Sequence, residues 1–271
     1  MLIIKAGGGR AIDWEEIGRD VSELRRTEPL VLVHGASARR DRLAARLGVE
    51  VRTVESPSGV TSVYTDDESL DIFLMAYAGL ANKRIVETLQ RRGVNAVGLS
   101  GADGGLWRAR RKAEILEKKG GRIRLLRGNL SGRVNSVNAD LVRLLLDAGY
   151  LPVICAPALS HDLRIVNTDN DTAAAVMAGA LGCRRMVALF EAPGLLRDAD
   201  DPSSRIPEID GNIIQDFGRF ARGRMKKKIM GAALALENGV EEIFWGDGRI
   251  ERPVFSALEG KGTIIRARSA A

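Results

Sequence analysis

Lys5 and the glycines that follow it are residues whose types and spacing are suited to chemistry. They come directly after residues 2–4, a short apolar run rich in β-branching, which predicts a buried strand. A lysine at the carboxyl end of such a strand is costly to keep dry unless an anion meets it. Glycines at positions 7–9 let backbone N–H groups approach that anion without hindrance from a Cβ atom. The pattern predicts a polyphosphate site, although a lysine reaching solvent beside an ordinary glycine turn explains these residues equally well.

Length and composition describe a globular protein with a substantial core. The chain has 271 residues, of which 45% are apolar and 28% charged, as is usual for a globular domain. No apolar run approaches the roughly 18–20 residues that span a bilayer. The first residues lack the basic region and apolar core of a signal peptide. We therefore expect one large α/β domain or two lobes within residues 1–271, in a protein that works in the cytoplasm, away from membranes.

Charge and metal-ligating residues narrow the choice of partners. The formal net charge of +6 favours an acidic partner. Aromatic residues make up only 4%, so nucleic-acid binding would rest on charge alone and is not expected. Cys155 and Cys183 sit in apolar sequence and should be reduced core residues. With His34 and His161 they are too few and too scattered for a metal site.

Apolar runs suited to strands alternate with segments of helical periodicity along most of the chain. This alternation predicts a mainly parallel sheet covered by helices on both faces. Further strands are expected at residues 30–34, 95–99, 151–157, 185–190, 242–245 and 263–265. Helices are expected at residues 14–24, 39–47, 68–92, 137–148, 172–181 and 223–237. Residues 55–66 should form a loop or hairpin, residues 164–171 a turn, and residues 198–207 a polar loop.

Residues 107–133 have a different composition, with ten basic side chains split by the turn signal Lys119-Gly120-Gly121. We expect a projecting basic β-hairpin there. A charged face exposed to solvent is the usual explanation of such a run, but here one sign dominates and no helical pairing offsets it.

Short motifs spread along the chain place small residues next to a lysine, histidine, amide or carboxylate. They are Lys5-Ala-Gly7-Gly8, His34-Gly35-Ala36, Ala78-Gly79-Leu-Ala-Asn82-Lys83, Val97-Gly-Leu-Ser-Gly101, Asn167-Thr-Asp169-Asn-Asp171 and Gly223-Arg-Met-Lys-Lys-Lys228. In order and spacing these motifs resemble the amino acid kinase family along nearly the whole chain, and most closely its acetylglutamate kinases. Within these, the run Arg110-Arg111-Lys112 and the helix starting near Arg224 favour the kinases that act on glutamate or aminoadipate attached to the carrier protein LysW.

The resemblance implies a three-layer α/β/α sandwich around a mainly parallel sheet of eight strands. It implies that residues 1–160, with the basic hairpin, bind the acyl acceptor and that residues 161–271 bind ATP. The nucleotide would bring Mg²⁺, held largely by phosphates and water. The resemblance also implies a homodimer that pairs through the helix at residues 68–92.

Phosphoryl transfer to a carboxylate brings two anions together, so the protein mainly has to position them and absorb charge. On the resemblance, Lys5 and Lys228 are the catalytic cations. Asp171 would orient both lysines and keep them charged, although it would also suit the N-cap of a helix starting at Thr172. His34 is expected to be structural, because a carboxylate nucleophile needs no base at neutral pH.

The resemblance assigns further binding residues. ATP would contact Gly7, Gly8, Glu191, Gly194, Leu195 and Met225, the acceptor would contact Gly35, Ala36, Val63 and Asn167, and the acidic carrier would contact Arg110, Arg111 and Lys112. Asn167 is a neutral donor suited to an amide or carboxylate, with an Asx-turn as the common alternative. Lys226 and Lys227 are expected to face solvent.

Three positions depart from the family pattern. Ala36 stands where the family usually has a second glycine, and its N–H stays usable if φ is negative. Phe190-Glu191 replaces a small polar residue followed by Asp or Asn near the adenine. Most importantly, Val63 stands where the family has an arginine that grips the substrate's α-carboxylate, and valine cannot form that ion pair. Either Arg10 or Arg39 reaches in, or the acceptor differs, or catalysis has been lost.

Three functions stay open at this point. The first is a kinase for carrier-bound aminoadipate or glutamate, and the second is a kinase for free N-acetylglutamate. The hairpin favours the first, because an acidic carrier would be steered by it and a small substrate does not need it. The third is a non-catalytic regulatory subunit, which Val63 supports and the intact Lys5, Asp171 and Lys228 oppose. A Rossmann dehydrogenase is disfavoured, since residues 7–9 lack the G-x-G-x-x-G spacing.

Overall fold

β1 (Leu2–Ala6) lies in the middle of a large sheet, parallel to β2 (Leu30–His34) on one side and β10 (Arg185–Phe190) on the other. The computed structural model describes residues 1–221 and 223–267. Every residue of β1 and β2 is buried, Lys5 included. The apolar runs therefore form the strands predicted for them, and β1 is two residues longer than expected.

The described residues place eleven strands in this sheet. Eight of them follow one another from the β11 edge: β11 (Glu208–Asp210), β13 (Thr263–Arg266), β12 (Glu242–Asp247), β10, β1, β2, β8 (Leu151–Ser160) and β5 (Ala96–Gly101), which pairs with β8. Only β12 and β13 run antiparallel among these neighbours. The parallel register brings the carboxyl ends of β1, β2, β8 and β10 to one edge, where a site is expected.

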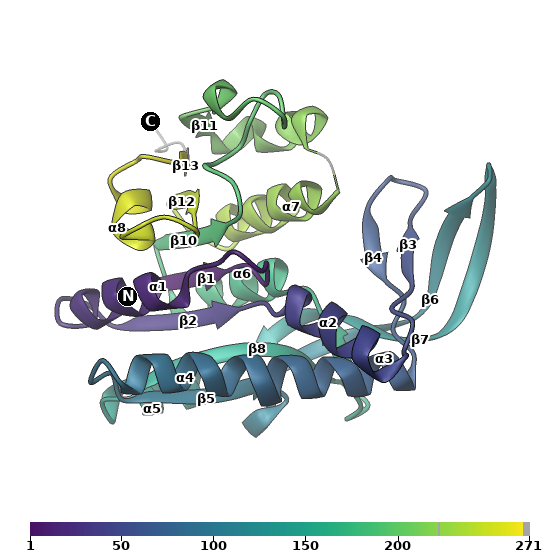
Figure 1. Ribbon diagram of the computed structural model, residues 1–271, viewed down its shortest axis with the longest axis horizontal. Coiled ribbons are helices and arrows are strands. Elements are labelled where there is room, and N and C mark those ends of the chain that lie inside the picture. Colours follow the sequence, from purple (N-terminus) through teal and green to yellow (C-terminus); the bar gives the residue numbers. More distant parts are fainter. Residues whose placement is uncertain (222, 268–271) are drawn as a thin grey trace.

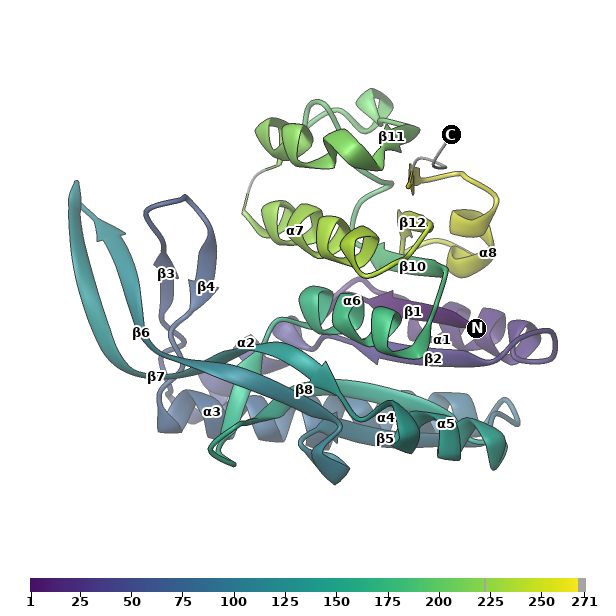
Figure 2. The same cartoon turned by 180° about the vertical axis from the view of Figure 1, so that it is seen from behind.

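Helices cover both faces of the sheet (Figures 1 and 2). One layer consists of α1 (Trp14–Leu24), α4 (Asn82–Gln90) and α8 (Pro253–Leu258), which share one apolar core with the strands. The opposite layer consists of α5 (Ala139–Asp147), α6 (Asn170–Leu181) and α7 (Arg224–Glu237). The predicted α/β/α sandwich is thus confirmed. As expected, Cys155 and Cys183 are buried free thiols.

Two hairpins project side by side from one end of the molecule (Figure 1). The longer one, β6 (Trp107–Lys119) and β7 (Arg122–Val137), is the predicted basic hairpin. The shorter one, β3 (Thr53–Glu55) and β4 (Thr61–Val63), begins two residues before the segment 55–66 that was predicted as loop or hairpin. An ion pair of 2.8 Å between Arg52 and Glu117 joins them, and the Tyr64 hydroxyl donates to the Arg127 carbonyl at 2.6 Å.

The long helix predicted at residues 68–92 is present but not uniformly α-helical. It comprises α3 (Asp67–Phe73), a π-helical segment η1 (Leu74–Ala81) and α4. Asp66 begins it, because its carboxylate accepts a hydrogen bond from the Ser69 N–H. A π-helical stretch widens the turn without ending the helix. Helix periodicity in sequence does not distinguish the two forms.

One predicted turn was wrong, because residues 165–168 form strand β9 (Ile165–Thr168). β9 pairs with β8 on one side and with β7 on the other, with Ser131 opposite Asn167. Four residues carry too little periodicity to predict a strand, and this one depends on pairing with distant segments. Other elements that the pattern did not predict are α8, β11 and the 3-10 segments η2 (Asp103–Gly105), η3 (Pro202–Ser204) and η4 (Gly211–Phe220). α2 (Ser37–Leu47) begins two residues earlier than predicted.

Within the described ranges, none of the helices combines the length and apolar character that crossing a bilayer requires.

His34 and Asn82 form a buried polar pair beneath the site. The Asn82 side-chain amide lies 3.1 Å from His34 Nε2 and donates to the Val153 carbonyl at 2.9 Å, and both side chains are fully buried. Burial lowers the pKa of His34 to about 4, so the ring is neutral at physiological pH. This geometry gives His34 the structural role expected for it.

Asn82→Ala should destabilise the fold, because it leaves His34 Nε2 and the Val153 carbonyl without this partner. A buried polar group left unpaired costs about 1–3 kcal/mol, and urea denaturation measures it. Glu87→Ala, on the exposed side of α4, is the matched control and should cost under about 0.5 kcal/mol. Equal denaturation midpoints for the two variants would contradict this account of the buried pair.

Candidate functional site

The turns that follow β1 and β2 touch backbone to backbone. A Cβ atom on Gly8 would lie 2.4 Å from the Ala36 nitrogen, and one on Gly35 would lie 2.7 Å from the Gly8 nitrogen. Ser37, the first residue of α2, donates its hydroxyl to the Gly8 carbonyl at 3.1 Å. Only glycine allows so close an approach at positions 8 and 35. Ala36 has a φ of −150°, so no glycine is needed there and its N–H stays usable.

Asp169, not Asp171, caps the helix that follows β9. The Asp169 carboxylate accepts from the N–H groups of Asp171 and Thr172, both at 3.0 Å. The N-cap alternative for Asp171 is therefore wrong, because α6 begins at Asn170, two residues earlier than expected. This cap places Asp171 in the first turn, where its carboxylate is turned toward β1 and α7.

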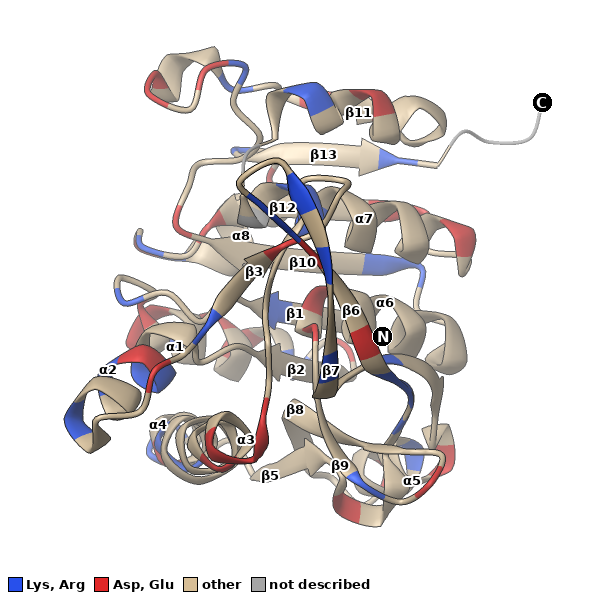
Figure 3. Cartoon of the chain, turned by 90° about the vertical axis from the view of Figure 1, so that its right-hand side faces the viewer, with Lys and Arg blue, Asp and Glu red and all other residues tan. Residues whose placement is uncertain are grey.

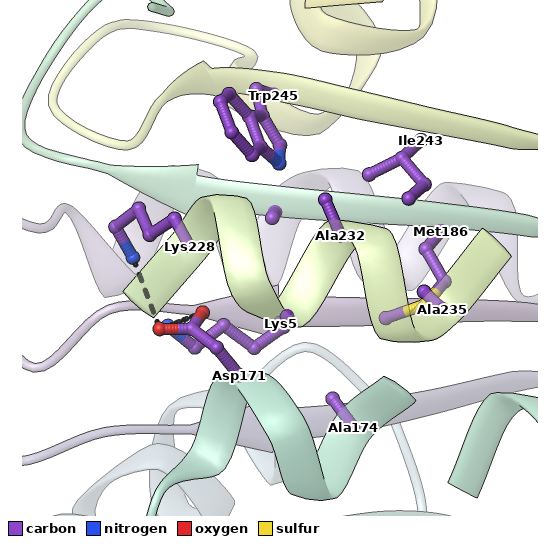
Figure 4. A pocket seen from close by; sticks show the side chains of 11 residues that line it. Lys5, Asp171, Ala174, Met186, Lys228, Ala232, Ala235, Ile243 and Trp245 are labelled. Carbon is purple, nitrogen blue, oxygen red and sulfur yellow. Dashed lines mark hydrogen bonds and ion pairs between the residues drawn. The ribbon is translucent and has the colours of Figure 1, made fainter. Parts of the chain in front are cut away.

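Asp171 bridges the two lysines that the sequence singled out (Figure 4). Its two oxygens lie 2.5 Å from Lys5 Nζ and 3.4 Å from Lys228 Nζ. Lys5 comes from the carboxyl end of β1 and Lys228 from the first turns of α7. Lys228 Nζ also lies 4.9 Å from the centre of the Phe190 ring, a cation–π contact.

Gly231 allows α7 to lie close to this bridge. A Cβ atom there would come within 3.0 Å of the Asp171 Cβ atom and 3.2 Å of its carbonyl carbon. Any larger residue would push α7 away from α6 and carry Lys228 with it. Lys228 and Gly231 lie three residues apart on α7, so both face Asp171: Lys228 supplies the cation, and Gly231 allows the close helix contact.

Lys5, Asp171 and Lys228 are buried together, and each shifts the pKa of the others. Burial alone would raise the pKa of Asp171, but the charges of Lys228 and Lys5 outweigh it and hold that pKa well below its usual range. Burial lowers the pKa of Lys5, yet the Asp171 charge outweighs it and the net pKa is raised. The pKa of Lys228 is lowered to about 8, mainly by burial. The negative charge of Asp171 opposes this shift only in part, and the positive charge of Lys5 adds to it. Of these three groups, Lys228 titrates nearest to physiological pH.

Lys226 and Lys227 are predicted to face solvent, but in the structure both side chains contact other parts of the chain. Lys226 Nζ donates to the Gly59 carbonyl in the β3–β4 turn at 3.4 Å, and Lys227 Nζ lies 3.7 Å from Asp169. Both side chains are half-buried. The prediction was wrong because the β3–β4 hairpin reaches across to the start of α7, a contact that no local pattern encodes. The Arg224 side chain lies outside the described residues.

The residues expected to hold the acceptor gather between β4, β9 and α2. The Asn167 amide donates to the Thr65 hydroxyl at 3.1 Å. Val63 is partly buried against an apolar cluster that includes Ala36 and Phe73. Of the two arginines considered as its substitutes, Arg10 is exposed, and Arg39 lies near Arg42 and Arg84, whose charges, after burial, lower its pKa.

The residues expected to hold ATP are spread more widely. Gly7 donates its N–H to the Leu189 carbonyl at 2.8 Å, and Glu191 accepts from the Ala11 N–H at 2.7 Å. Leu195 is buried in the main core, with its N–H bonded to Thr263. Gly194 has a φ of 145° and Met225 packs on the core at the start of α7. Gly8 and Met225 are partly exposed, whereas Leu195 is buried.

The described residues contain no group of three histidine, cysteine or carboxylate side chains that could hold a metal ion. The carboxylates nearest the lysines, Asp169 and Asp171, are both engaged by lysine Nζ atoms. Carboxylates already paired with ammonium groups are poor ligands for a resident cation.

Residues 1–244 match the sequence pattern described as the amino acid kinase family. This chain belongs to the amino acid kinase family. It is 44% identical over 266 residues to the "[LysW]-aminoadipate kinase" of Deinococcus radiodurans, covering 98% of this chain and 91% of that one. The Thermus thermophilus protein of that name is 42% identical, with 98% and 100% covered. The acetylglutamate kinase of Methanopyrus kandleri is 35% identical, also with 98% and 100% covered.

Solved structures share the fold of this amino acid kinase. An N-acetylglutamate synthase from Neisseria gonorrhoeae, complexed with coenzyme A and N-acetyl-glutamate, superposes with a TM-score of 0.80 at 23% identity. The match covers 99% of this chain and 60% of the synthase. A carbamate kinase from Giardia lamblia bound to AMP-PNP has a TM-score of 0.70 at 15% identity, with 98% of both chains covered.

Lys5→Ala and Lys228→Ala should each reduce turnover strongly and leave the fold intact, because each removes one charge that Asp171 holds. Losing a comparable charge-stabilising donor costs about 10²–10³ in kcat, or ~2.7–4 kcal/mol. Steady-state ATP consumption measures turnover, and circular dichroism checks the fold. Lys261→Ala, at a surface ion pair with Glu259, is the control. Near-normal turnover of either site variant would remove its charge-stabilising role.

The pH dependence should report Lys228. As the pH rises through about 8, the free enzyme loses the Lys228 charge, so kcat/KM for ATP should fall. Bound phosphates favour the charged form, so the same decline should appear at higher pH in kcat. Lys228→Arg stays charged over this range and should lack the decline. A wild-type kcat/KM that stays flat from about pH 7 to about pH 9.5 would show that this charge is not needed.

Proposed function

We propose that this amino acid kinase transfers the γ-phosphoryl group of ATP to the side-chain carboxylate of 2-aminoadipate or glutamate carried on an acidic LysW-like protein, in lysine or arginine biosynthesis. The observation that carries the proposal is Asp171 bridging Lys5 and Lys228 at 2.5 and 3.4 Å at the edge where the parallel strands end. The names of the relatives that are 42–44% identical support the choice of acceptor.

The reaction joins two anions, and the chain's own charges address that problem. An oxygen of the acceptor carboxylate attacks the γ-phosphorus, the bond from that phosphorus to the β–γ bridging oxygen breaks, and an acyl phosphate and ADP result. Lys5 would neutralise charge on the transferred group, and Lys228 charge on the oxygens toward the leaving group. Gly8 would add a backbone donor. Mg²⁺ would enter with the nucleotide and neutralise phosphate charge.

The two substrates would approach from the two halves of the chain. Residues 161–271, with the start of α7 and the end of β10 near Gly194, would hold the nucleotide. Residues 1–160, with Asn167 from β9 beside them, would hold the acceptor. A carboxylate nucleophile needs no deprotonation at neutral pH, so His34 with its pKa of about 4 is not required as a base.

The β6–β7 hairpin would dock the carrier. In Figure 3, where Lys and Arg are blue, basic residues lie on both strands of the hairpin, in front of the sheet edge. Near its tip, Leu116, Ile123 and Leu125 are 48%, 60% and 48% exposed on the face opposite the Arg52–Glu117 ion pair. Exposed apolar side chains rimmed by cations suit an acidic protein better than a small anion.

A kinase for free N-acetylglutamate is the alternative, supported by the 35% identical acetylglutamate kinase. A non-catalytic regulatory homologue is less well supported, since the buried charges around Asp171 are costly to retain without a ligand for them.

An ATP-consumption assay separates these functions. The purified protein is given carrier loaded with aminoadipate, carrier loaded with glutamate, or free N-acetylglutamate, and the acyl phosphate is trapped with hydroxylamine. We expect hydroxamate from at least one loaded carrier at a kcat/KM well above that for the free acid. Preference for free N-acetylglutamate would favour the alternative, and no hydroxamate from any acceptor would favour the regulatory homologue.

Replacing Arg110, Arg111 and Lys112 together with alanine should raise the apparent KM for the carrier and spare that for ATP. Raising salt should weaken carrier-dependent activity mainly through the association rate, since the screening length falls to ~3 Å at 1 M. Steady-state kinetics at two salt concentrations measure both effects. If the carrier KM and its salt dependence stay unchanged, the hairpin is only a solvated face and free N-acetylglutamate becomes the better substrate assignment.

We also propose a homodimer that pairs through the helix spanning α3, η1 and α4. Met75 and Leu80 on η1 are 45% and 39% exposed, which leaves apolar surface for a partner. Light scattering should give twice the chain mass at micromolar concentration, and Met75→Glu should lower it. A wild-type monomer at that concentration would rule the dimer out.

A further inference from the structure

Lys112 and Arg133, at the base of the basic hairpin, are exposed and lie on the face of their strands that Asn167 shares. In the β6–β7 ladder, Lys112 lies opposite Ser131 and Arg110 lies opposite Arg133. In the β7–β9 ladder, Ser131 lies opposite Asn167. Paired residues point to the same face of a sheet, and so do residues two apart on one strand. Lys112, Ser131, Arg133 and Asn167 therefore share one face.

The other face of the same strands is the apolar core. Ala109 and Val134 are buried there, and a Cβ atom on Gly132 would lie 3.1 Å from the Val166 side chain. Arg111 belongs to that side and donates its Nε–H to the Asn129 carbonyl at 3.1 Å. The three consecutive cations of the motif are thus divided between two faces.

Within the described residues, neither Lys112 nor Arg133 forms an ion pair with a carboxylate. The pKa of Lys112 is lowered, first by burial and then by the charges of Arg133 and Lys227, while Asp169 acts in the opposite direction. Asp169 is already paired with Lys227 at 3.7 Å. Lys112 therefore lies close enough to the start of α6 to sense these charges, and an anion arriving there would be stabilised.

We propose that Lys112 and Arg133, with Asn167 beside them, bind the α-carboxylate of the carrier-bound acceptor. This inference rests on the proposed function. An amino acid attached to a carrier through its nitrogen keeps its α-carboxylate, a second negative charge separated by a short aliphatic chain from the carboxylate that reacts. Neighbouring strands lie about 4.8 Å apart, so Lys112 is two strand spacings from Asn167, a distance that its long side chain can span.

Other cations near the site are less available for this role. Lys5 and Lys228 are held by Asp171, and Lys227 pairs with Asp169. Val63 offers no charge, and none of the described hydrogen bonds or ion pairs joins Arg10 or Arg39 to Asn167. Lys112 and Arg133 thus act as specificity-determining residues for the α-carboxylate, a role separate from docking the carrier protein.

The test pairs each enzyme variant with two acceptors. Carrier is loaded by semisynthesis either with 2-aminoadipate or with 5-aminopentanoate, which keeps the reacting carboxylate and lacks the α-carboxylate. Lys112→Met and Arg133→Gln should each lower kcat/KM for the aminoadipate carrier roughly 10- to 100-fold. On the aminopentanoate carrier, which reports docking alone, the loss in kcat/KM should be several-fold smaller than on the aminoadipate carrier, with KM for ATP unchanged.

Lys118→Met, near the tip of the same hairpin, is the matched control, and any effect of it should be shared equally by both carriers. Equal losses on both carriers for Lys112→Met and Arg133→Gln would mean that these cations act only in docking, and unchanged kinetics would mean that they bind nothing in the reaction. Either result overturns the subsite and leaves the proposed kinase standing. A wild-type protein that consumes no ATP with the aminoadipate carrier would overturn the proposed function, and the subsite with it.

Discussion

One buried carboxylate between two buried ammonium groups is the interaction on which the geometry of the candidate site depends. Two lysines withdrawn from water repel each other and each is costly to keep charged. Asp171 makes their burial tolerable only if β1, α6 and α7 approach within hydrogen-bond distance of one point. The Asp169 cap sets where α6 begins, and Gly231 lets α7 close on it. Burial and repulsion still leave Lys228 with a pKa of about 8, so the charge that stabilises a phosphoryl group is also the one most easily lost.

The surrounding fold follows from the need to bring two anions to that point. Parallel strands end together, so the glycine turns after β1 and β2 and the start of α6 meet at one edge of the sheet. The two hairpins rise from the same end, where Lys226 contacts the turn between β3 and β4 and Glu117 pairs with Arg52. A partner docked on the β6–β7 hairpin would therefore be next to both the proposed acceptor pocket and the helix that carries Lys228.

The sequence predicted the parts of this arrangement that local pattern encodes. Strand β1 with Lys5 at its end, the basic hairpin and the alternating layers follow from apolar periodicity, glycine placement and charge. The parts that depend on distant pairing were missed or misplaced. Strand β9 exists because β7 and β8 pair with it, the cap of α6 is Asp169 because β9 ends there, and Lys226 is covered because a hairpin far away in sequence reaches it. In the sequence, residues 110–112 form a single run of positive charge. Only the strand register shows that Arg110 and Lys112 lie on one face of the hairpin and Arg111 on the other.

The most direct test of the account is the titration of Lys228 itself. In protein labelled with ¹⁵N at lysine Nζ, with the Lys228 signal assigned from its loss in Lys228→Arg, the signal should titrate near pH 8. In Asp171→Asn, which keeps the shape and removes the charge, the pKa of Lys228 should fall well below 8, and turnover should fall with it. If the pKa of Lys228 and the turnover were both the same in wild type and Asp171→Asn, the bridging carboxylate would not be what holds the site together.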